Sequence, residues 1–358
     1  MYTYTQLKDF TNQVFIKMGC PEDQAEIASK TLVSADLRGV DSHGVARLSG
    51  YVRLWEAGRI KPNPEIKIVH ETPSTAVIDG DAGLGLVVGP ASMKIAIEKA
   101  KKVGTGWISV KNSNHFGIAG YHSMLALEHD MIGISMTNAS PLVAPTWSKE
   151  RMLGTNPIAV AIPAGEEPPF VADFATTTAA NGKLEILQRK KENTPTGWTQ
   201  NPEGKPSTDP FEVKNGGALL PLGSDREHGS HKGYCLGSIV DIFSAVLSGA
   251  SYGPWAPPFV SFLPVADDMP GEGLGHFFGA MSVDAFQSKE NFKANMDNWI
   301  KRFKSASTIE GQEEVLVPGD PERILEQERI KSGIRLLEPV ENDLKTLAQK
   351  FQLNLPLK

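Results

Sequence analysis

The sequence is poor in cysteine, with only two, Cys20 and Cys235, among 358 residues. Two thiols cannot form the disulfide network of a small secreted domain, and they are too few for a cysteine-rich zinc site. The sequence also lacks the run of about 18 apolar residues that a membrane-spanning helix needs, and residues 1–8 lack the apolar core of a signal peptide. We therefore expect reduced thiols, a cytoplasmic location and no membrane partner.

Positive charge is in slight deficit, because 36 Lys and Arg stand against 42 Asp and Glu, for a net charge of -6 at pH 7. This balance opposes nonspecific attraction to nucleic acid, so we expect no nucleic-acid partner. A small anionic substrate would need its own cation, which draws attention to Arg47 and Lys232. The length leaves room for a large core and for two domains.

The sequence also lacks a complete dinucleotide fingerprint. Gly83 and Gly85 follow an expected strand and precede an expected helix, but the third glycine position holds Val88. The next expected strand ends in Lys111 instead of the acidic residue that would bind a ribose. We therefore predict a tight packing turn here and reject a Rossmann domain.

Polar side chains gather in residues 36–48, where one expected helix ends and the next begins. An apolar pattern of helical spacing closes near Gly39. Asp41 and Ser42 have side-chain oxygens suited to cap the following helix, whose first turn would then hold His43. In that position the helix dipole would disfavour a protonated imidazole.

His43, Arg47 and Tyr51 are spaced at i, i+4 and i+8, so a helix would place them on one face. Such a face presents an imidazole, a guanidinium and a phenol, which suits a small substrate with a carboxylate. The alternative is a surface helix with scattered polar residues, and the spacing alone does not exclude it.

His115 lies in a second polar segment, residues 111–121, at an expected junction of strand and helix. Polar groups converge on ligands at such junctions, although a lone histidine is equally explained as a loop residue with satisfied hydrogen bonds. His228 and His231 could suggest a metal, but no carboxylate or cysteine set stands at ligand spacing around them. We therefore expect no metal site.

Several motifs resemble the malate/L-lactate dehydrogenase type 2 family. Asp-Ser-His-Gly-Val-Ala-Arg at 41–47 and Asn-His-Phe-Gly-Ile-Ala-Gly-Tyr at 114–121 resemble its signatures, and the runs 136–145, 153–163 and 315–322 follow in the family's order. The resemblance extends from about Asp36 to Glu322. It implies an NAD(P)-dependent oxidoreductase of 2-hydroxy, 2-oxo or imino acids.

The resemblance implies a non-Rossmann α/β fold with a helical N-terminal part and a central mixed sheet. We expect residues 1–75 and 290–358 to pack together as the helical part, and residues 76–289 to form the nucleotide- and substrate-binding α/β domain. Family members form homodimers with the site near the subunit interface, so we expect a homodimer.

Two other segments have patterns of their own. Residues 193–217 are rich in Pro, Gly, Thr and Asn, which predicts a long surface loop. Residues 288–304 predict a helix whose inward side would hold Phe292, Met296, Trp299, Ile300 and Phe303. The run Ser224–Ser230 departs from the family, which passes almost directly into Lys-Gly-Tyr at this point. His276, in a Gly-His-Phe-Phe run, is interpreted as a packing residue.

The resemblance also implies a set of site residues. His115 and His43 would act on the substrate oxygen, with His115 preferred as the base, and the substrate would contact Arg47, Ser42, Tyr51 and Thr155. The nicotinamide cofactor would contact Ser140, Asp173, Phe174, Ala175, His231, Lys232, Gly319, Asp320 and Pro321. Without the family, strand-end turns and a solvated lysine are the favoured explanations of the cofactor-side residues.

The chemistry follows from these groups. A histidine pKa lies near working pH and suits proton transfer, whereas the cofactor carries the hydride. We expect an NAD- or NADP-dependent dehydrogenase of a small 2-hydroxy acid, with malate first because the family is so named. The alternatives are lactate, sulfolactate, ureidoglycolate, diketogulonate, piperideine-carboxylate or a catalytically silent binding protein. No local motif separates NAD from NADP.

Overall fold

A mixed seven-stranded sheet forms the centre of the computed structural model, which describes residues 1–355. The strands lie in the order β1-β2-β3-β10-β4-β5-β6, and every neighbouring pair is antiparallel except β2 and β3. Their bounds are Lys67–Glu71, Thr75–Asp79, Thr105–Ser113, Leu274–Ser282, Met131–Thr137, Ile158–Ile162 and Phe170–Phe174 in that order. The expected mixed sheet is confirmed, and a doubly wound parallel sheet is excluded.

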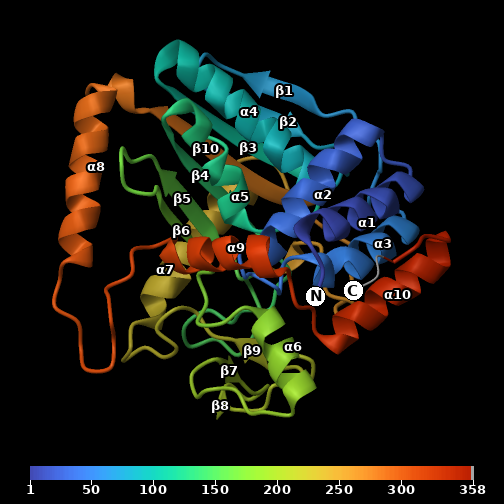
Figure 1. Cartoon of the computed structure of the whole chain (residues 1–358). Helices are drawn as coiled ribbons and strands as arrows, with labels where there is room; N and C mark the ends of the chain where they lie inside the picture. The colour runs from blue at the N-terminus through green and yellow to red at the C-terminus, as the bar shows by residue number, and fades with distance from the viewer. Residues whose placement is uncertain (356–358) are drawn as a thin grey trace.

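Helices cover both faces of this sheet, as the alternation of side chains along β10 shows. Phe278 packs in one hydrophobic cluster with residues of α4 (Gly85–Val103), whereas its neighbour Phe277 contacts Phe243 on the opposite face. The first face also carries α5 (Ala119–Met124), and Phe243 belongs to a π-helical turn, Ile242–Val246, that continues α7 (Ser230–Asp241). Figure 1 shows α4 and α5 lying across the strands.

The glycines before α4 are packing residues, as predicted. A Cβ on Gly85 would lie 2.1 Å from the carbonyl oxygen of Asn114 and 2.6 Å from that of His115. The helix therefore begins at a glycine because its first turn touches the backbone of the His115 segment.

A second layer consists of helices from both ends of the chain. α1 (Tyr4–Lys17), α2 (Glu22–Leu37), α3 (Leu48–Glu56) and α10 (Glu338–Phe351) share one hydrophobic cluster. The Thr3 hydroxyl accepts the N–H of Gln6, whose side chain accepts the N–H of Thr3, so a capping box begins α1. Farther along the chain, α9 (Asp320–Ser332) contacts α2, and the Arg38 guanidinium pairs with Glu326 at 2.7 Å.

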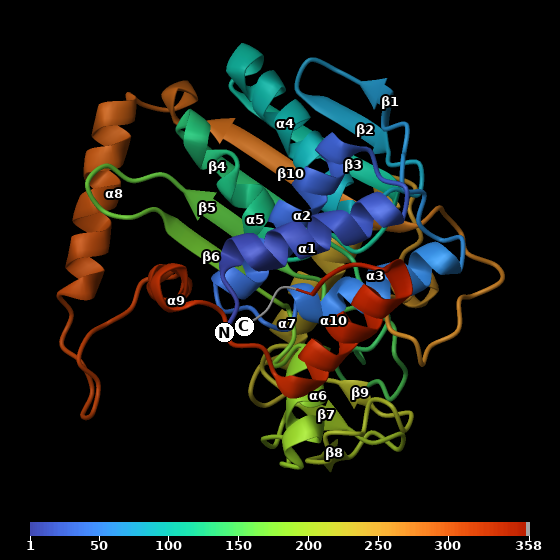
Figure 2. The same ribbon diagram turned by 45° about the vertical axis from the view of Figure 1, so that its right-hand side comes forward.

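α8 (Lys289–Lys304) does not join these helices. It lies apart from them, beside β5 and β6 at that edge of the sheet (Figure 2). Asp297 accepts the backbone N–H groups of Gly165, Glu166 and Glu167 there. The predicted inward face of α8 is wrong for Trp299 and Phe303, which are 39% and 47% exposed. The division into residues 1–75 with 290–358 and 76–289 stays a prediction, and α8 is not packed as it requires.

The segment 193–217 is not a plain loop. It contains β7 (Thr199–Gln200) and β8 (Pro206–Ser207). β7 is the central strand of a small second sheet and pairs with both β8 and β9 (Ala218–Leu219). With α6 (Asn181–Lys190) these strands form a lobe below the main sheet (Figure 1).

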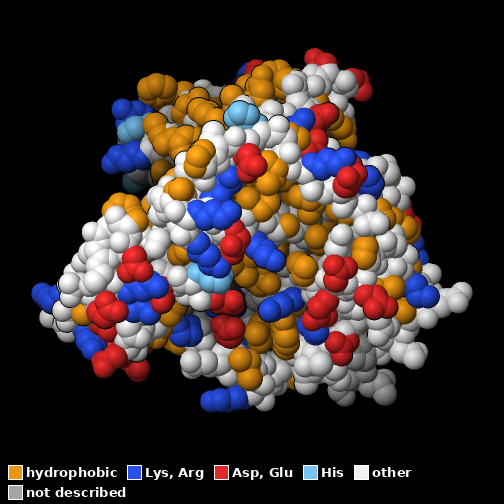
Figure 3. All heavy atoms as spheres, turned by 90° about the horizontal axis from the view of Figure 1, so that it is seen from above, with side chains coloured by type: hydrophobic (Ala, Val, Ile, Leu, Met, Phe, Trp, Pro, Cys, Tyr) orange, Lys and Arg blue, Asp and Glu red, His pale blue; other side chains and the backbone are white. Residues whose placement is uncertain are grey.

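The surface seen in Figure 3 mixes acidic and basic side chains over its middle, and hydrophobic side chains gather in its upper part. Within residues 1–355, no helix combines the length and the apolar character that crossing a bilayer requires.

The turn that carries His43 differs from the prediction. The helix begins later than expected, as a 3-10 turn at Val45–Arg47 that leads into α3, so His43 precedes it. Neither Asp41 nor Ser42 caps the helix; instead an oxygen of the buried Asp36 carboxyl group, on α2, accepts the N–H of Val45 at 2.8 Å. A Cβ on Gly44 would lie 2.1 Å from that carboxyl group, so only glycine fits.

We expect Asp36→Asn to flatten the pH dependence of stability. Burial raises the pKa of the Asp36 carboxyl from 3.8 to about 8, so the folded protein holds a proton that the unfolded chain releases. This contribution to stability is complete below pH of about 4 and is lost as pH rises toward 8. Between pH 5 and pH 8 the melting temperature of the wild type should therefore fall more than that of the variant. Asp9→Asn, at an exposed position, is the control, and equal slopes for wild type and Asp36→Asn would contradict the assignment.

Candidate active site

Two histidines from different layers face each other at the centre of the molecule. His43 comes from the turn before α3 and His115 from the segment after β3, and their rings stack with centroids 5.8 Å apart and planes 20° from parallel. The Tyr51 hydroxyl, on α3, lies 2.6 Å from Nδ1 of His115, and the Ser42 hydroxyl lies 2.9 Å from Nδ1 of His43. The structure thus brings together the residues that the motifs singled out.

Hydrogen bonding fixes the tautomer of His115. The backbone N–H of Gly117 can only donate, and it lies 3.3 Å from Nδ1, which must therefore be an acceptor. The Tyr51 hydroxyl then donates to the same nitrogen, and the proton of the neutral imidazole sits on Nε2. This nitrogen is free of those two partners and is the one suited to meet a substrate oxygen.

Both imidazoles are neutral at physiological pH. Enclosure by protein, with a smaller effect of the Arg47 charge, lowers the pKa of His43 to about 4. Enclosure also lowers the pKa of His115 well below its usual range, and His43 and Arg47 add to the effect. A helix dipole is not the cause for His43, since the residue lies outside the helix.

Arg47 is held at the edge of this pair. Its Nε donates to the carbonyl oxygen of Ser42 at 2.6 Å, and its Nη2 lies 3.2 Å from the Glu185 carboxylate of α6. His43, Arg47 and His115 line a cavity of about 70 Å³ together with Ala139, Ser140, Leu142, Thr155, Ala180, Asn181, Gly182, Phe259 and Val260. We refer to it as the substrate cavity.

Phe259 closes one side of the substrate cavity. Its ring lies 4.6 Å from that of His115 and 5.2 Å from that of Tyr51, and its N–H donates to the Ser140 hydroxyl at 2.8 Å. The carbonyl oxygen of Phe259 accepts from Arg53, and that of Pro258 accepts from Arg59. The loop over the histidines is therefore anchored by arginines on and just after α3.

A larger cavity of about 360 Å³ adjoins the substrate cavity, because His43, Thr155 and Ala180 line both. We refer to it as the nucleotide cleft. Its walls include Asp173, Phe174, Ala175, Gly117, Gly120, Thr178, Arg38, Lys183 and Glu322. The Asp173 carboxylate accepts the N–H of Gly120 at 2.7 Å, and the surrounding protein raises the pKa of this carboxyl to about 6.

The predicted cofactor contacts, all in the described part of the chain, separate into groups. Asp173, Phe174 and Ala175 line the nucleotide cleft, whereas Ser140 lines only the substrate cavity. His231, Lys232, Gly319, Asp320 and Pro321 line neither cavity.

These outlying residues have structural partners. Asp320 accepts the N–H of Val317 at 2.9 Å and pairs with Arg323 at the start of α9. His231 contacts the Arg226 guanidinium at 2.9 Å, and Lys232 is exposed on the first turn of α7. Their roles toward a cofactor stay predictions.

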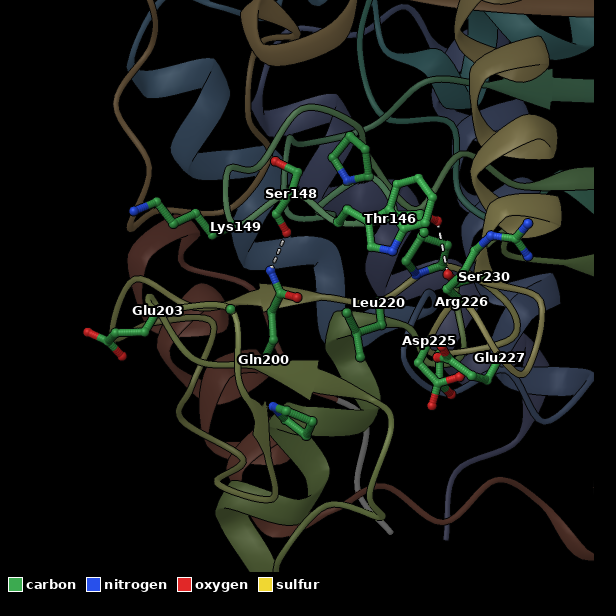
Figure 4. A pocket seen from close by; sticks show the side chains of 16 residues that line it. Thr146, Ser148, Lys149, Gln200, Glu203, Leu220, Asp225, Arg226, Glu227 and Ser230 are labelled. Atoms are coloured by element: carbon green, nitrogen blue, oxygen red, sulfur yellow. Dashed lines mark hydrogen bonds between the residues drawn. The ribbon is translucent and has the colours of Figure 1, made fainter.

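A further cavity, of about 470 Å³, lies elsewhere and has no predicted site residue in its lining (Figure 4). The inserted run 224–230 forms one wall, and the Thr146 and Ser230 hydroxyls meet across it at 2.9 Å. Trp147 is 86% exposed at its rim, under the Arg226 guanidinium. Nearby, His228 pairs with Asp225 at 2.7 Å, and residues 1–355 contain no cluster of three or more His, Cys, Asp or Glu placed to hold a metal.

Several functional residues escape sequence reasoning. Phe259, Asn181 and Glu185 reach the substrate cavity or its arginine from segments distant in the chain, and Lys183 reaches the nucleotide cleft. Residues 175–180 join the end of β6 to the start of α6, and this junction of strand and helix is the local signal that points to Asn181 and Lys183.

A mixed-sheet α/β fold in which a histidine pair and an arginine share a small cavity beside a larger cleft is the arrangement expected of a non-Rossmann oxidoreductase. The sequence profile of the malate/L-lactate dehydrogenase family matches residues 2–345, and the chain belongs to this family. It is 44% identical over 346 residues to a malate dehydrogenase of Pyrococcus abyssi, covering 96% of this chain and 93% of that protein. It is 41% identical to an L-sulfolactate dehydrogenase of Methanocaldococcus jannaschii, covering 96% and 94% of the two chains.

Solved structures agree. The crystal structure of malate dehydrogenase from Entamoeba histolytica superposes with a TM-score of 0.92 at 37% identity, and the match covers 99% of each chain.

His276 holds the segment that carries His115. Its ring is fully buried on β10, with Nε2 2.7 Å from the Ser113 hydroxyl and Nδ1 2.7 Å from the Thr137 hydroxyl. The ring of Phe116, directly after His115, lies 4.8 Å from that of His276. The interpretation of His276 as a packing residue is therefore incomplete, because the side chain also ties the end of β3 to β4.

We expect His276→Phe to lower kcat by about tenfold to a hundredfold, since a small misplacement of His115 has effects of that size. The phenyl ring keeps the stacking on Phe116 but loses both hydrogen bonds.

Thr137→Val is the matched control, since it removes only the partner on β4. An unchanged kcat in His276→Phe, or an equal loss in Thr137→Val, would show that the bond to Ser113 does not position His115.

Proposed function

We propose that this protein catalyses the nicotinamide-dependent interconversion of malate and oxaloacetate. The observation that carries the proposal is the convergence of His43, His115 and Arg47 on one small cavity beside the nucleotide cleft. The name of the Pyrococcus relative supports malate as the substrate. A 3-sulfonated 2-hydroxy acid is the second candidate, because the sulfolactate dehydrogenase is nearly as similar.

The nucleotide cleft fits a nicotinamide dinucleotide, NAD or NADP, in its chemistry. Its volume of about 360 Å³ is that of a small-molecule site, and its walls combine apolar, hydroxyl and charged groups. Arg38 and Lys183 would face the diphosphate, and Asp173 and Glu322 would accept hydrogen bonds from ribose or carboxamide groups. When bound, the nicotinamide supplies the hydride acceptor.

The protein's own residues would hold the substrate and move one proton. Arg47 binds the substrate carboxylate, with a planar fork that fixes its orientation. That carboxylate adds a negative charge to the cavity that both histidines line, so substrate binding raises their pKa toward the working range. With its pKa raised, His115 takes up a second proton and becomes an imidazolium, which donates its Nε2 proton to the 2-oxo oxygen during reduction and returns to a neutral imidazole. His43 supports the same oxygen.

The test is turnover, followed as the absorbance of the reduced nicotinamide. NADH and NADPH are each offered with oxaloacetate, pyruvate, 3-sulfopyruvate and a cyclic imino acid. We expect oxaloacetate to be reduced fastest, and His115→Ala and His43→Ala each to lose about a hundredfold or more. A different preferred acid would redirect the substrate assignment, and the absence of binding to either nucleotide would refute the dehydrogenase proposal.

We also propose a cytoplasmic homodimer. α7 and its π-helical continuation leave an apolar strip on the surface, in which Tyr234, Ile239, Ile242, Phe243, Val246 and Leu247 are 38% to 59% exposed. Contiguous apolar surface of this kind usually marks an interface between proteins, and a second copy is the partner that a symmetric oligomer supplies.

Ile242→Glu places a charge in the middle of that strip, so we expect the mass measured by light scattering to fall to that of one chain. Ile330→Glu, at a 64% exposed position on α9, should leave the mass unchanged. A wild-type protein of single-chain mass would contradict the dimer.

A further inference from the structure

The arginine that should bind the substrate carboxylate already holds a carboxylate. Nη2 of Arg47 lies 3.2 Å from Oε2 of Glu185, and Nη1 lies 3.5 Å from Oε1, so both ends of the fork face one side chain. Asn181, which lines the substrate cavity, donates to Oε1 of the same glutamate at 3.0 Å. A substrate would therefore compete with Glu185 for the guanidinium.

The substrate cavity is also too small as it stands. Its volume is about 70 Å³, whereas sites for small organic molecules usually have about 300 Å³ or more. A second cavity of about 300 Å³ lies behind the Arg47–Glu185 pair, lined by both residues and by Arg53, Lys214 and Phe259. Arg47 and Phe259 line both spaces, so the ion pair stands between them.

This second cavity contains a cation that Glu185 could join. The Lys214 ammonium donates to the side-chain oxygen of Gln188 at 2.7 Å, and it makes no ion pair within residues 1–355. Gln188 follows Glu185 by three positions on α6, so the two side chains lie on the same face of the helix. Lys214 and Glu185 thus line the same cavity, and the partner of the ammonium lies one helical turn beyond Glu185.

We propose that Glu185 is a displaceable counter-ion that occupies the carboxylate-binding arginine in the free protein and moves to Lys214 when an acid substrate binds. The proposal rests on the proposed function, because it takes Arg47 as the receptor of a 2-oxo acid. The substrate carboxylate replaces the Glu185 carboxylate at Arg47, so the guanidinium stays paired throughout. The rotation of Glu185 opens the substrate cavity toward the larger space behind it.

Every acid substrate must first break the ion pair between Arg47 and Glu185, and the free energy of that pair is subtracted from its binding. Partly exposed ion pairs correspond to a factor of about two to five in binding. Glu185→Gln keeps the size of the side chain and its hydrogen bond with Asn181 but removes the charge. We therefore expect kcat/KM for oxaloacetate to rise about two- to fivefold and the KM for the nucleotide to stay unchanged.

Lys214→Met should have the opposite effect, since Glu185 then has no second partner and stays on Arg47. The double variant gives the decisive comparison. In Glu185→Gln no carboxylate is left to move to Lys214, so removing the lysine should have no further effect. The kcat/KM of the double variant, Glu185→Gln with Lys214→Met, should therefore equal that of Glu185→Gln alone. Glu192→Gln, an exposed glutamate just after α6, is the charge control and should match the wild type.

Binding of oxalate, measured by calorimetry on the protein with nucleotide present, provides a readout that needs no turnover. We expect Glu185→Gln to bind oxalate about two- to fivefold more tightly and Lys214→Met to bind it more weakly. If Glu185→Gln weakens oxalate binding, Glu185 positions Arg47 instead of competing for it, and the proposal is overturned. If Lys214→Met weakens oxalate binding equally in the wild type and in the Glu185→Gln variant, the lysine acts on the ligand directly and the exchange is refuted. Oxalate binding without turnover of any 2-oxo acid would refute the proposed function while leaving the exchange testable.

Discussion

The geometry of the site depends on one hydrogen bond, from the N–H of Val45 to the buried carboxyl group of Asp36. This carboxyl group also leaves no space for a side chain at residue 44. His43 and Arg47 lie on either side of this contact, so their positions are set from α2, a helix inside the N-terminal hydrophobic cluster. A turn that would otherwise be free to move is thereby attached to a rigid element, as a preorganised site requires.

The wall of the substrate cavity that faces His43 belongs to the layer of the central sheet. His115 extends from β3, is held through Ser113 by His276 on β10, and is covered by Phe259. Tyr51 is the direct link between the walls, because it belongs to α3 and bonds to His115. The substrate cavity therefore lies at the contact of two layers, and the distance between the stacked histidines depends on how the helical layer packs on the sheet.

Local patterns predict the parts of this fold that are local. The helical spacing that closes near Gly39 leads to α2. The motifs around His43 and His115 lead to the right fold class and to residues that line the substrate cavity. The prediction is wrong for the start of α3, because the cap comes through space from Asp36 and not from Ser42. The helix predicted for 288–304 is confirmed as α8, but its predicted inward face is wrong at Trp299 and Phe303, since an apolar stripe does not reveal whether anything covers it. Phe259 and Glu185 are not found at all, because only the folded chain brings them to Arg47 and His115.

The central position of β10 has a consequence for how the chain is made. This strand, residues 274–282, lies between β3 and β4, which are synthesised well before it. Until it emerges from the ribosome, both of those strands present open edges, which invite pairing with other chains. Completion of the sheet then requires one long-range insertion late in synthesis, and such non-local pairing is slow. Newly made chains of this protein therefore pass through a period in which the sheet is unfinished and protection from aggregation matters most.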